Sequence, residues 1–120
     1  MDRYNWQSVP VEQMNPQVTR QVIHTPGMTI ARLRLAKGAI VPEHSHPNEQ
    51  VCMVASGALV FKMAGEDFEL RAGSVLRVPP HLPHSVVVLE DAEATDLFTP
   101  AREDWLRGDD SYLRGGADSK

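Results

Sequence analysis

The feature that most constrains the fold of this sequence is a series of short apolar segments at regular intervals between residues 28 and 98. The first segment alternates strictly: Ala31, Leu33 and Leu35 face one way and two arginines face the other, as in a half-buried strand. Further strands are predicted over residues 51–55, 59–63, 68–71, 75–78, 85–89 and 94–98. Glycines, including Gly57, and a proline-rich loop separate them. Short strands at this spacing are typical of an all-β sandwich or barrel.

The length of 120 residues corresponds to a single domain, so one fold must carry the function. We expect an N-terminal arm with one or two edge strands over residues 1–27 and a β-barrel over residues 28–100. Residues 101–120 are expected to form a short helical turn, around residues 102–106, followed by a polar, frayed tail beyond Gly108. Exposed edge strands and apolar residues in the arm make a homodimer the expected assembly.

Charge and composition exclude several classes of function. The chain has 12 basic and 16 acidic residues, a formal net charge of −4, and no cluster of Lys and Arg, so we expect no nucleic-acid partner. No segment is long and apolar enough to cross a membrane. Cys52 is the only cysteine, and the first residues lack the apolar run of a signal peptide. We therefore expect a cytoplasmic protein without an intrachain disulfide.

Four of the five histidines lie in two proline-rich segments, residues 42–50 and 79–84. His44 and His46 are two residues apart, so in a strand their side chains would project to the same side. A turn after them would bring Gln50 back toward the same interior, and His84 would add a third imidazole from the facing loop.

This donor set has a definite chemistry. Three imidazole nitrogens and one neutral amide oxygen suit one divalent ion such as Ni, Zn, Mn, Fe or Co, and positions left open on the ion imply catalysis. Spacing alone leaves an alternative, because isolated His-x-His pairs are common in surface loops.

The spacing resembles the two motifs of the cupin superfamily, G-x5-H-x-H-x(3,4)-E-x6-G and G-x5-P-x-G-x2-H-x3-N. The positions that match are Gly38, His44, His46, Gln50 and Gly57 in the first motif, and Gly73, Pro79 and His84 in the second. The resemblance implies an RmlC-like double-stranded β-helix, or jelly-roll barrel, with His44, His46, Gln50 and His84 as metal ligands. The sequence departs from the motifs at Gln50 (usually Glu), His81 (usually Gly) and Val88 (usually Asn).

The departure at Gln50 changes the electrostatics of the site. A Glu ligand would cancel one charge of a divalent ion, whereas Gln50 leaves the site at a formal charge of +2. Such a metal is a stronger Lewis acid and a better host for an anionic substrate.

Two segments, residues 44–50 and 96–105, resemble the KdgF family of pectin-degradation cupins, which linearise 4,5-unsaturated uronates. The resemblance implies that Asp96, Phe98 and Arg102 lie in the substrate pocket. Arg102 would clamp the carboxylate of a small anionic substrate, and Asp96 would transfer a proton during ring opening and conversion of enol to ketone.

Each of these residues also has a structural alternative. Asp96 could form an ion pair with Arg102 or Arg34, and Arg102 could be a surface residue at a helix start. Cys52 is expected to be a small buried residue and His81 a solvent-facing one. Apolar residues near the C-terminus could cover the barrel rim or pack on a second subunit; they are Trp105, Leu106, Tyr112 and Leu113.

Two other functions fit the same metal site. One is a dioxygenase that uses Mn or Fe, which three histidines and open positions would permit. The other is a cupin without catalytic activity that binds a small ligand. The residues contain no feature that separates these from an isomerase or lyase acting on a sugar acid or on an enol or keto compound.

Overall fold

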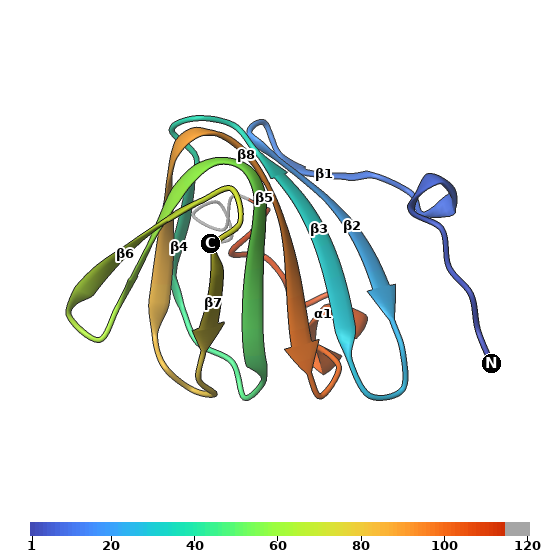
Figure 1. Ribbon diagram of the computed structural model, residues 1–120. Helices are drawn as coiled ribbons and strands as arrows, with labels where there is room; N and C mark the ends of the chain where they lie inside the picture. The colour runs from blue at the N-terminus through green and yellow to red at the C-terminus, as the bar shows by residue number, and fades with distance from the viewer. Residues whose placement is uncertain (115–120) are drawn as a thin grey trace.

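Two long strands, β5 (Glu49–Met63) and β8 (His84–Thr99), form the centre of the fold in the computed structural model, which describes residues 1–114 (Figure 1). They belong to an eight-stranded antiparallel sheet with the order β1-β2-β3-β8-β5-β6, in which β4 pairs with β8 and β7 with β5. The remaining strands are β1 (Glu12–Asn15), β2 (Val18–His24), β3 (Thr29–Leu35), β4 (Ile40–His44), β6 (Glu66–Arg71) and β7 (Val75–Val78). The all-β expectation is confirmed.

The alternation in the sequence corresponds to the two faces of the sheet. In β3, Ala31, Leu33 and Leu35 are buried inside the barrel, whereas Arg34 is exposed. The core continues across β5 and β8, whose buried apolar side chains, such as Leu59, belong to the same cluster. Burial of these apolar surfaces on one face of each strand is the main force that holds the barrel closed.

The strands are longer than the sequence predicted. Residues 51–55 and 59–63 form one strand, and so do residues 85–89 and 94–98, so the expected breaks are wrong. The register of β5 against β8 shifts around Gly57, whose φ of +79° is readily adopted only by glycine. The strand therefore bends at a bulge instead of ending there.

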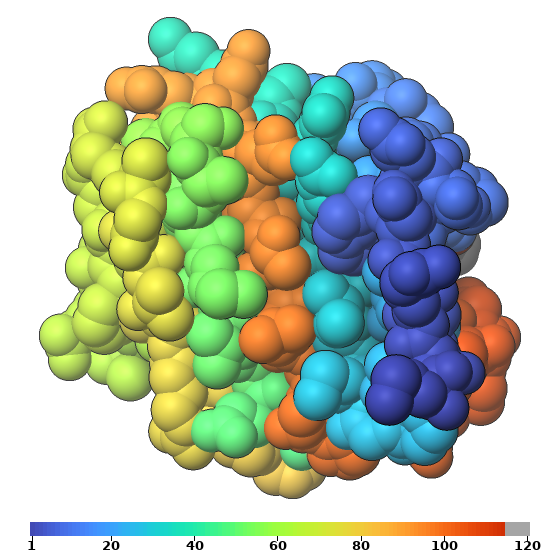
Figure 2. Space-filling model, turned by 45° about the vertical axis from the view of Figure 1, so that its right-hand side comes forward, coloured from blue at the N-terminus to red at the C-terminus, as the bar shows by residue number. Residues whose placement is uncertain are grey.

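The N-terminal arm contributes β1 and β2 to the sheet, and the residues before β1 cover the outer face of the sheet. The short 3-10 helix η1 (Trp6–Ser8) lies before β1, and Figure 2 shows the N-terminal residues on the outer surface of the neighbouring strands. The amide of Gln21 donates to the carbonyls of Trp6 and Val9 at 2.8 and 2.9 Å. The guanidinium of Arg32 lies 5.8 Å from the centroid of the Trp6 ring. These contacts fix the arm against β2 and β3.

The C-terminal segment begins with one helical turn, α1 (Glu103–Leu106), as expected. Trp105 packs into the core, whereas Leu106 is exposed. The expectation of a frayed polar tail beyond Gly108 is wrong for residues 109–114, because Asp110 and Leu113 are buried; residues 115–120 lie outside the described part of the chain. Within residues 1–114, no helix has the length and apolar character needed to span a membrane.

The bulge at Gly57 predicts a large difference between two glycine substitutions. A Cβ at Gly57 would lie 2.0 Å from the backbone oxygen of Asp91, whereas a Cβ at Gly65, also at positive φ, would meet nothing within 4 Å. Gly65→Ala should cost about 1 kcal/mol of unfolding free energy through backbone strain. Gly57→Ala should cost roughly 1 to 3 kcal/mol more, because the overpacked backbone must move. Denaturant unfolding of both variants measures the difference, and equal losses would contradict the steric explanation.

Candidate metal centre and its cavity

Three histidines converge at one end of the barrel. His44 is the last residue of β4, His84 is the first of β8, and the two are paired in register. Their ligand atoms and that of His46 all lie within 4.8 Å of one another. Because β4 ends at His44, the following loop, and not strand alternation, brings His46 into the cluster.

Hydrogen bonds to the backbone set the tautomer of each ring. The Nδ1 atoms of His44, His46 and His84 lie 2.8, 3.1 and 2.8 Å from the carbonyl oxygens of Pro42, Asn48 and Leu82. A carbonyl oxygen only accepts, so each Nδ1 carries the hydrogen and each neutral ring keeps a lone pair on Nε2. Metal-binding histidines are typically oriented in this way.

Burial keeps the three rings neutral. It lowers the pKa of His44 and of His46 to about 4, and it also lowers the pKa of His84. The positive charge of Arg102 lowers all three pKa values further. The lone pairs are therefore free at neutral pH, as a divalent ion requires.

Two unsatisfied positions show that the donor set fits a cation. Among residues 1–114, the buried Nε2 of His84 has no hydrogen-bond partner. The Nε2 of His46 lies 3.1 Å from Oε1 of Gln50, so two atoms with lone pairs face the same region. A divalent ion bound by His44, His46, Gln50 and His84 would satisfy both positions.

The two proline-rich loops are tied together beside this cluster. The backbone N–H of His81 donates to the carbonyl of His46 at 2.8 Å, while the His81 side chain is exposed, as expected. The side-chain amide of Asn48 donates to the carbonyl of Pro100 at 2.6 Å. The loop that carries His46 is thus hydrogen-bonded both to the loop of residues 79–84 and to the chain just after β8.

The residues predicted from the C-terminal segment line the same cavity as His44 and His84. Its polar and aromatic lining includes His44, Gln50, His84, Asp96, Phe98 and Arg102. Asp96 and Phe98 share the inner face of β8, opposite Cys52 and Gln50 of β5. Cys52 is buried, as expected for a small apolar residue.

Asp96 has an unusual environment for a carboxylate. Burial raises its pKa to about 6, although hydrogen-bonding contacts with the side chains of Cys52 and Gln50 and the charge of Arg102 act in the opposite direction. Its Oδ1 atom is buried without a partner among the described residues. No ion pair of Asp96 with Arg34 or Arg102 is found in residues 1–114, so that alternative is wrong.

Arg102 is buried, with 1% of its surface exposed, so the alternative of a surface residue is also wrong. Its Nε and Nη2 donate to the two carboxylate oxygens of Asp104 at 2.9 and 2.8 Å, and Nη2 also donates to the hydroxyl of Tyr112 at 3.1 Å. Burial opposes its charge, but the hydrogen bonds to Asp104 and Tyr112 outweigh this and raise its pKa. Its Nη1 atom has no partner in the described part of the chain.

The sequence did not predict two residues that shape this site. The ring of Tyr112 stacks on His44, with centroids 4.3 Å apart and planes at 28°. Thr29, fully buried in β3, accepts a hydrogen bond from the backbone N–H of Arg102 at 2.8 Å. Tyr112 was expected to cover the barrel rim or to pack on a second subunit, not to stack on a histidine, and Thr29 has no motif around it that could have shown its role.

Known proteins resemble this chain in both sequence and fold. A family model described as "Cupin domain" matches residues 31–99. KdgF from a Halomonas species is 28% identical, with a TM-score of 0.79 over 87% of this chain and 99% of that one. An RmlC-like cupin from Shewanella frigidimarina is 27% identical, with a TM-score of 0.80 over 88% and 96% of the two chains.

More distant structures share the fold alone. The polyketide cyclase RemF from Streptomyces resistomycificus is 17% identical, with a TM-score of 0.70 over 83% of this chain and 79% of that one. No curated protein matches the chain.

The convergence of the histidines predicts which substitutions abolish metal binding. The double substitution His44→Ala and His46→Ala should leave protein without metal after dialysis, because two ligands cannot hold the ion. His81→Asn should keep the metal, since its side chain is exposed and Asn tolerates its positive φ of 68°. Elemental analysis of the purified proteins measures occupancy, and full occupancy in the double variant would show that the ligands are misassigned.

The buried carboxyl group of Asp96 predicts a pH-dependent effect on stability. Its pKa is about 6 in the folded protein and 3.8 when exposed. Ionisation therefore opposes folding progressively above about pH 4, with the full penalty reached above about pH 6. In metal-free protein, Asp96→Asn should raise the free energy of unfolding by up to about 3 kcal/mol at about pH 8, and this gain should vanish toward about pH 4.

Denaturant unfolding at several pH values tests this, with Asp67→Asn as the matched control because the Asp67 carboxylate is exposed. A loss of stability in Asp96→Asn at about pH 8 would mean that the carboxylate stabilises the fold.

Proposed function

Because the chain belongs to the cupin family, with the domain match covering more than half of its length, we propose that it is a metal-dependent enzyme that acts on a small anionic sugar acid. The specific reaction we propose is linearisation of a 4,5-unsaturated uronate. The similarity to the Halomonas KdgF structure supports this choice of reaction.

One observation carries the proposal: three buried polar atoms without partners among residues 1–114 belong to side chains that line a single cavity. They are Nε2 of His84, Oδ1 of Asp96 and Nη1 of Arg102. Buried polar groups cost free energy unless they are paired, so such a set indicates a polar ligand. A carboxylate suits the free donor of Arg102, and the hydroxyl groups of a sugar acid suit Asp96.

A divalent ion held by His44, His46, Gln50 and His84 would supply Lewis acidity to the substrate's oxygen atoms. Arg102 would hold the substrate carboxylate through Nη1, since its other nitrogens are already oriented by Asp104. Phe98, which lies under the Arg102 guanidinium at 4.7 Å, would form the apolar floor beside that carboxylate.

Asp96 is the group positioned to move protons. Ring opening breaks the bond between C1 and the ring oxygen. The proton of the C1 hydroxyl moves to the ring oxygen, which leaves an aldehyde at C1 and an enol at C5. The enol then loses its hydroxyl proton while C4 gains one, which gives a ketone with no net change in composition. A single carboxyl group beside the substrate can accept and return these protons.

The proposal is tested by turnover of an unsaturated uronate under anaerobic conditions, followed by the loss of absorbance of its conjugated double bond. Protein loaded with Ni or Zn should be active without oxygen. Activity that requires oxygen together with Mn or Fe would instead identify a dioxygenase, and the absence of turnover with every metal would contradict an enzyme acting on this substrate.

The roles of Asp96 and Arg102 predict different kinetic changes. Asp96→Asn should lower kcat by about 10²- to 10⁴-fold with metal content unchanged, because the amide cannot act as a base. Arg102→Ala should mainly raise KM, because the carboxylate loses its partner. Asp67→Asn on the surface is the matched control and should retain wild-type kinetics. A decrease in kcat of less than about tenfold for Asp96→Asn would exclude a proton-transfer role.

A further inference from the structure

The metal-centre cavity is too small for a sugar acid in this conformation. Its volume is about 50 Å³, well below the roughly 300 to 1,000 Å³ of pockets that enclose small-molecule ligands. Three of its lining residues come from the C-terminal segment: Trp105, Tyr112 and Leu113. A sugar acid can therefore bind at His44 and His84, the two histidines that line this cavity, only if part of the protein moves.

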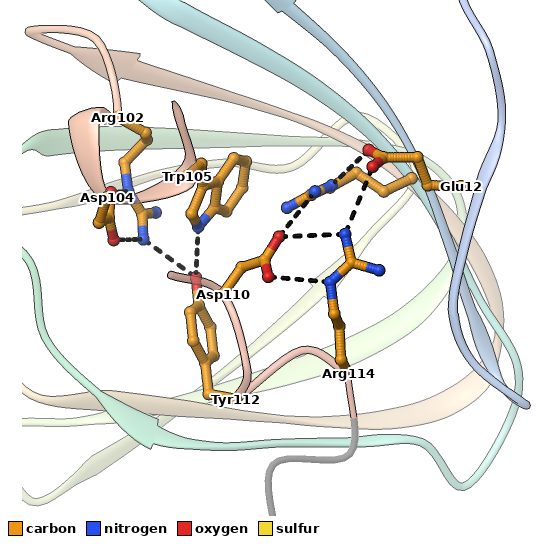
Figure 3. Close-up of polar contacts among 8 residues, drawn as sticks. Glu12, Arg102, Asp104, Trp105, Asp110, Tyr112 and Arg114 are labelled. Atoms are coloured by element: carbon orange, nitrogen blue, oxygen red, sulfur yellow. Dashed lines mark hydrogen bonds and ion pairs between the residues drawn. The ribbon is translucent and has the colours of Figure 1, made fainter. Parts of the chain in front are cut away.

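The segment that closes the cavity is Asp109–Arg114, which we name the C-terminal plug. Its Tyr112 ring covers His44, and its Leu113 side chain is buried in the core. The hydroxyl of Tyr112 accepts hydrogen bonds from Nη2 of Arg102 at 3.1 Å and from the indole N–H of Trp105 at 3.2 Å (Figure 3). The plug thus covers a candidate metal ligand and also occupies one nitrogen of the candidate carboxylate clamp.

Four charged residues hold the plug on the N-terminal strands, and we name them the latch: Glu12, Arg20, Asp110 and Arg114. Asp110 lies between two arginines, 2.9 Å from Nη2 of Arg20 and 2.8 Å from Nε of Arg114. Figure 3 shows its contact with Arg114. Glu12 lies 3.1 Å from Nε of Arg20 and 3.4 Å from Nη2 of Arg114. Two positive and two negative charges therefore balance, and both Arg20 and Asp110 are buried.

The plug is held by side chains and not by the sheet. In residues 1–114, its backbone N–H groups that form backbone hydrogen bonds donate only to nearby carbonyls, those of Asp104, Asp110 and Ser111. A further tie to the strands is the amide of Asn15, which donates to the carbonyl of Leu113 at 2.7 Å. Release of the plug would leave every strand pairing of the barrel intact, so it can open without global unfolding.

We propose that the C-terminal plug is a removable wall of the metal-centre cavity, and that ligands of the size of a sugar acid or a chelator reach His44 and His84 only when the latch opens. Resting on the function proposed above, the substrate carboxylate held by Nη1 of Arg102 then also accepts the Nη2 hydrogen bond that the Tyr112 hydroxyl accepts in the closed form. Tyr112 is accordingly a residue that competes with the substrate for the site. It determines access to the site and takes no part in the proton transfers.

The access step is tested without any substrate, by the rate at which a chromogenic chelator removes Ni²⁺ from the loaded full-length protein. Asp110→Asn removes the charge between the two arginines and should accelerate removal by about tenfold or more. Arg114→Gln keeps the buried Arg20–Asp110 pair and should give a smaller acceleration in a protein that folds normally. Asp67→Asn, the same change in an exposed ion pair far from the plug, should match the wild type.

Trp105 provides a second measurement that does not depend on metal affinity. The chain has two tryptophans, so a Trp6→Phe background leaves the buried Trp105 as the reporter. Acrylamide quenching of its fluorescence should increase in Asp110→Asn and in Arg114→Gln. If folded Arg114→Gln and Asp110→Asn both match Asp67→Asn in quenching and in Ni²⁺ removal, the plug does not control access and the proposal is wrong.

Tyr112→Phe tests the exchange at Arg102. The ring still covers His44, but the hydroxyl that occupies Nη2 is gone, so KM for the uronate should fall severalfold while kcat stays the same. A lower kcat would instead make Tyr112 a catalytic acid or base and overturn its competing role. Failure of the proposed function remains distinguishable, because absence of uronate turnover in the wild type leaves the Ni²⁺ and quenching results as an independent test of the plug.

Discussion

The pairing of β5 with β8 is the constraint on which the rest of the structure depends. The two strands stay in contact from Glu49 opposite Thr99 to Met63 opposite His84, with the register shifts absorbed around Gly57. This one ladder places Gln50 beside Phe98 and Cys52 beside Asp96 on the inner face, and it fixes where His84 begins its strand. A slip of one residue would turn all of these side chains outward, so the register of the sheet is also the geometry of the site.

The interior of the barrel sets the chemistry of the candidate site through desolvation. Low polarity keeps the imidazoles of His44, His46 and His84 uncharged and ready to bind a cation, and the same low polarity penalises the carboxylate of Asp96. A bound divalent ion would oppose the second effect, since Gln50, one of its candidate ligands, contacts Asp96. The buried carboxylate of Asp96 therefore lowers the stability of the metal-free protein, while the uncharged imidazoles are ready to bind a cation.

Arg102 is buried although one of its nitrogens, Nη1, has no hydrogen-bond partner among the described residues. The Arg102 guanidinium lies over the rings of both Phe98 and Trp105, and it is fixed by hydrogen bonds to Asp104 and Tyr112. This arrangement defines the direction of the remaining N–H groups before any ligand arrives. Preorganisation of this kind reduces the entropy that binding must otherwise overcome.

The sequence by itself determined which segments are apolar strands and which three histidines gather, because periodicity and motif spacing can be read along the chain; it also offered Gln50 as a neutral fourth ligand. It did not determine that β5 and β8 run unbroken through their bends, or that a segment expected to fray closes the cavity. Tyr112 contacts His44, and Asp110 contacts Arg20 across 90 positions of sequence. Only the tertiary structure decided these contacts, because they depend on where the completed barrel leaves apolar and charged surface uncovered, and no local pattern encodes that surface.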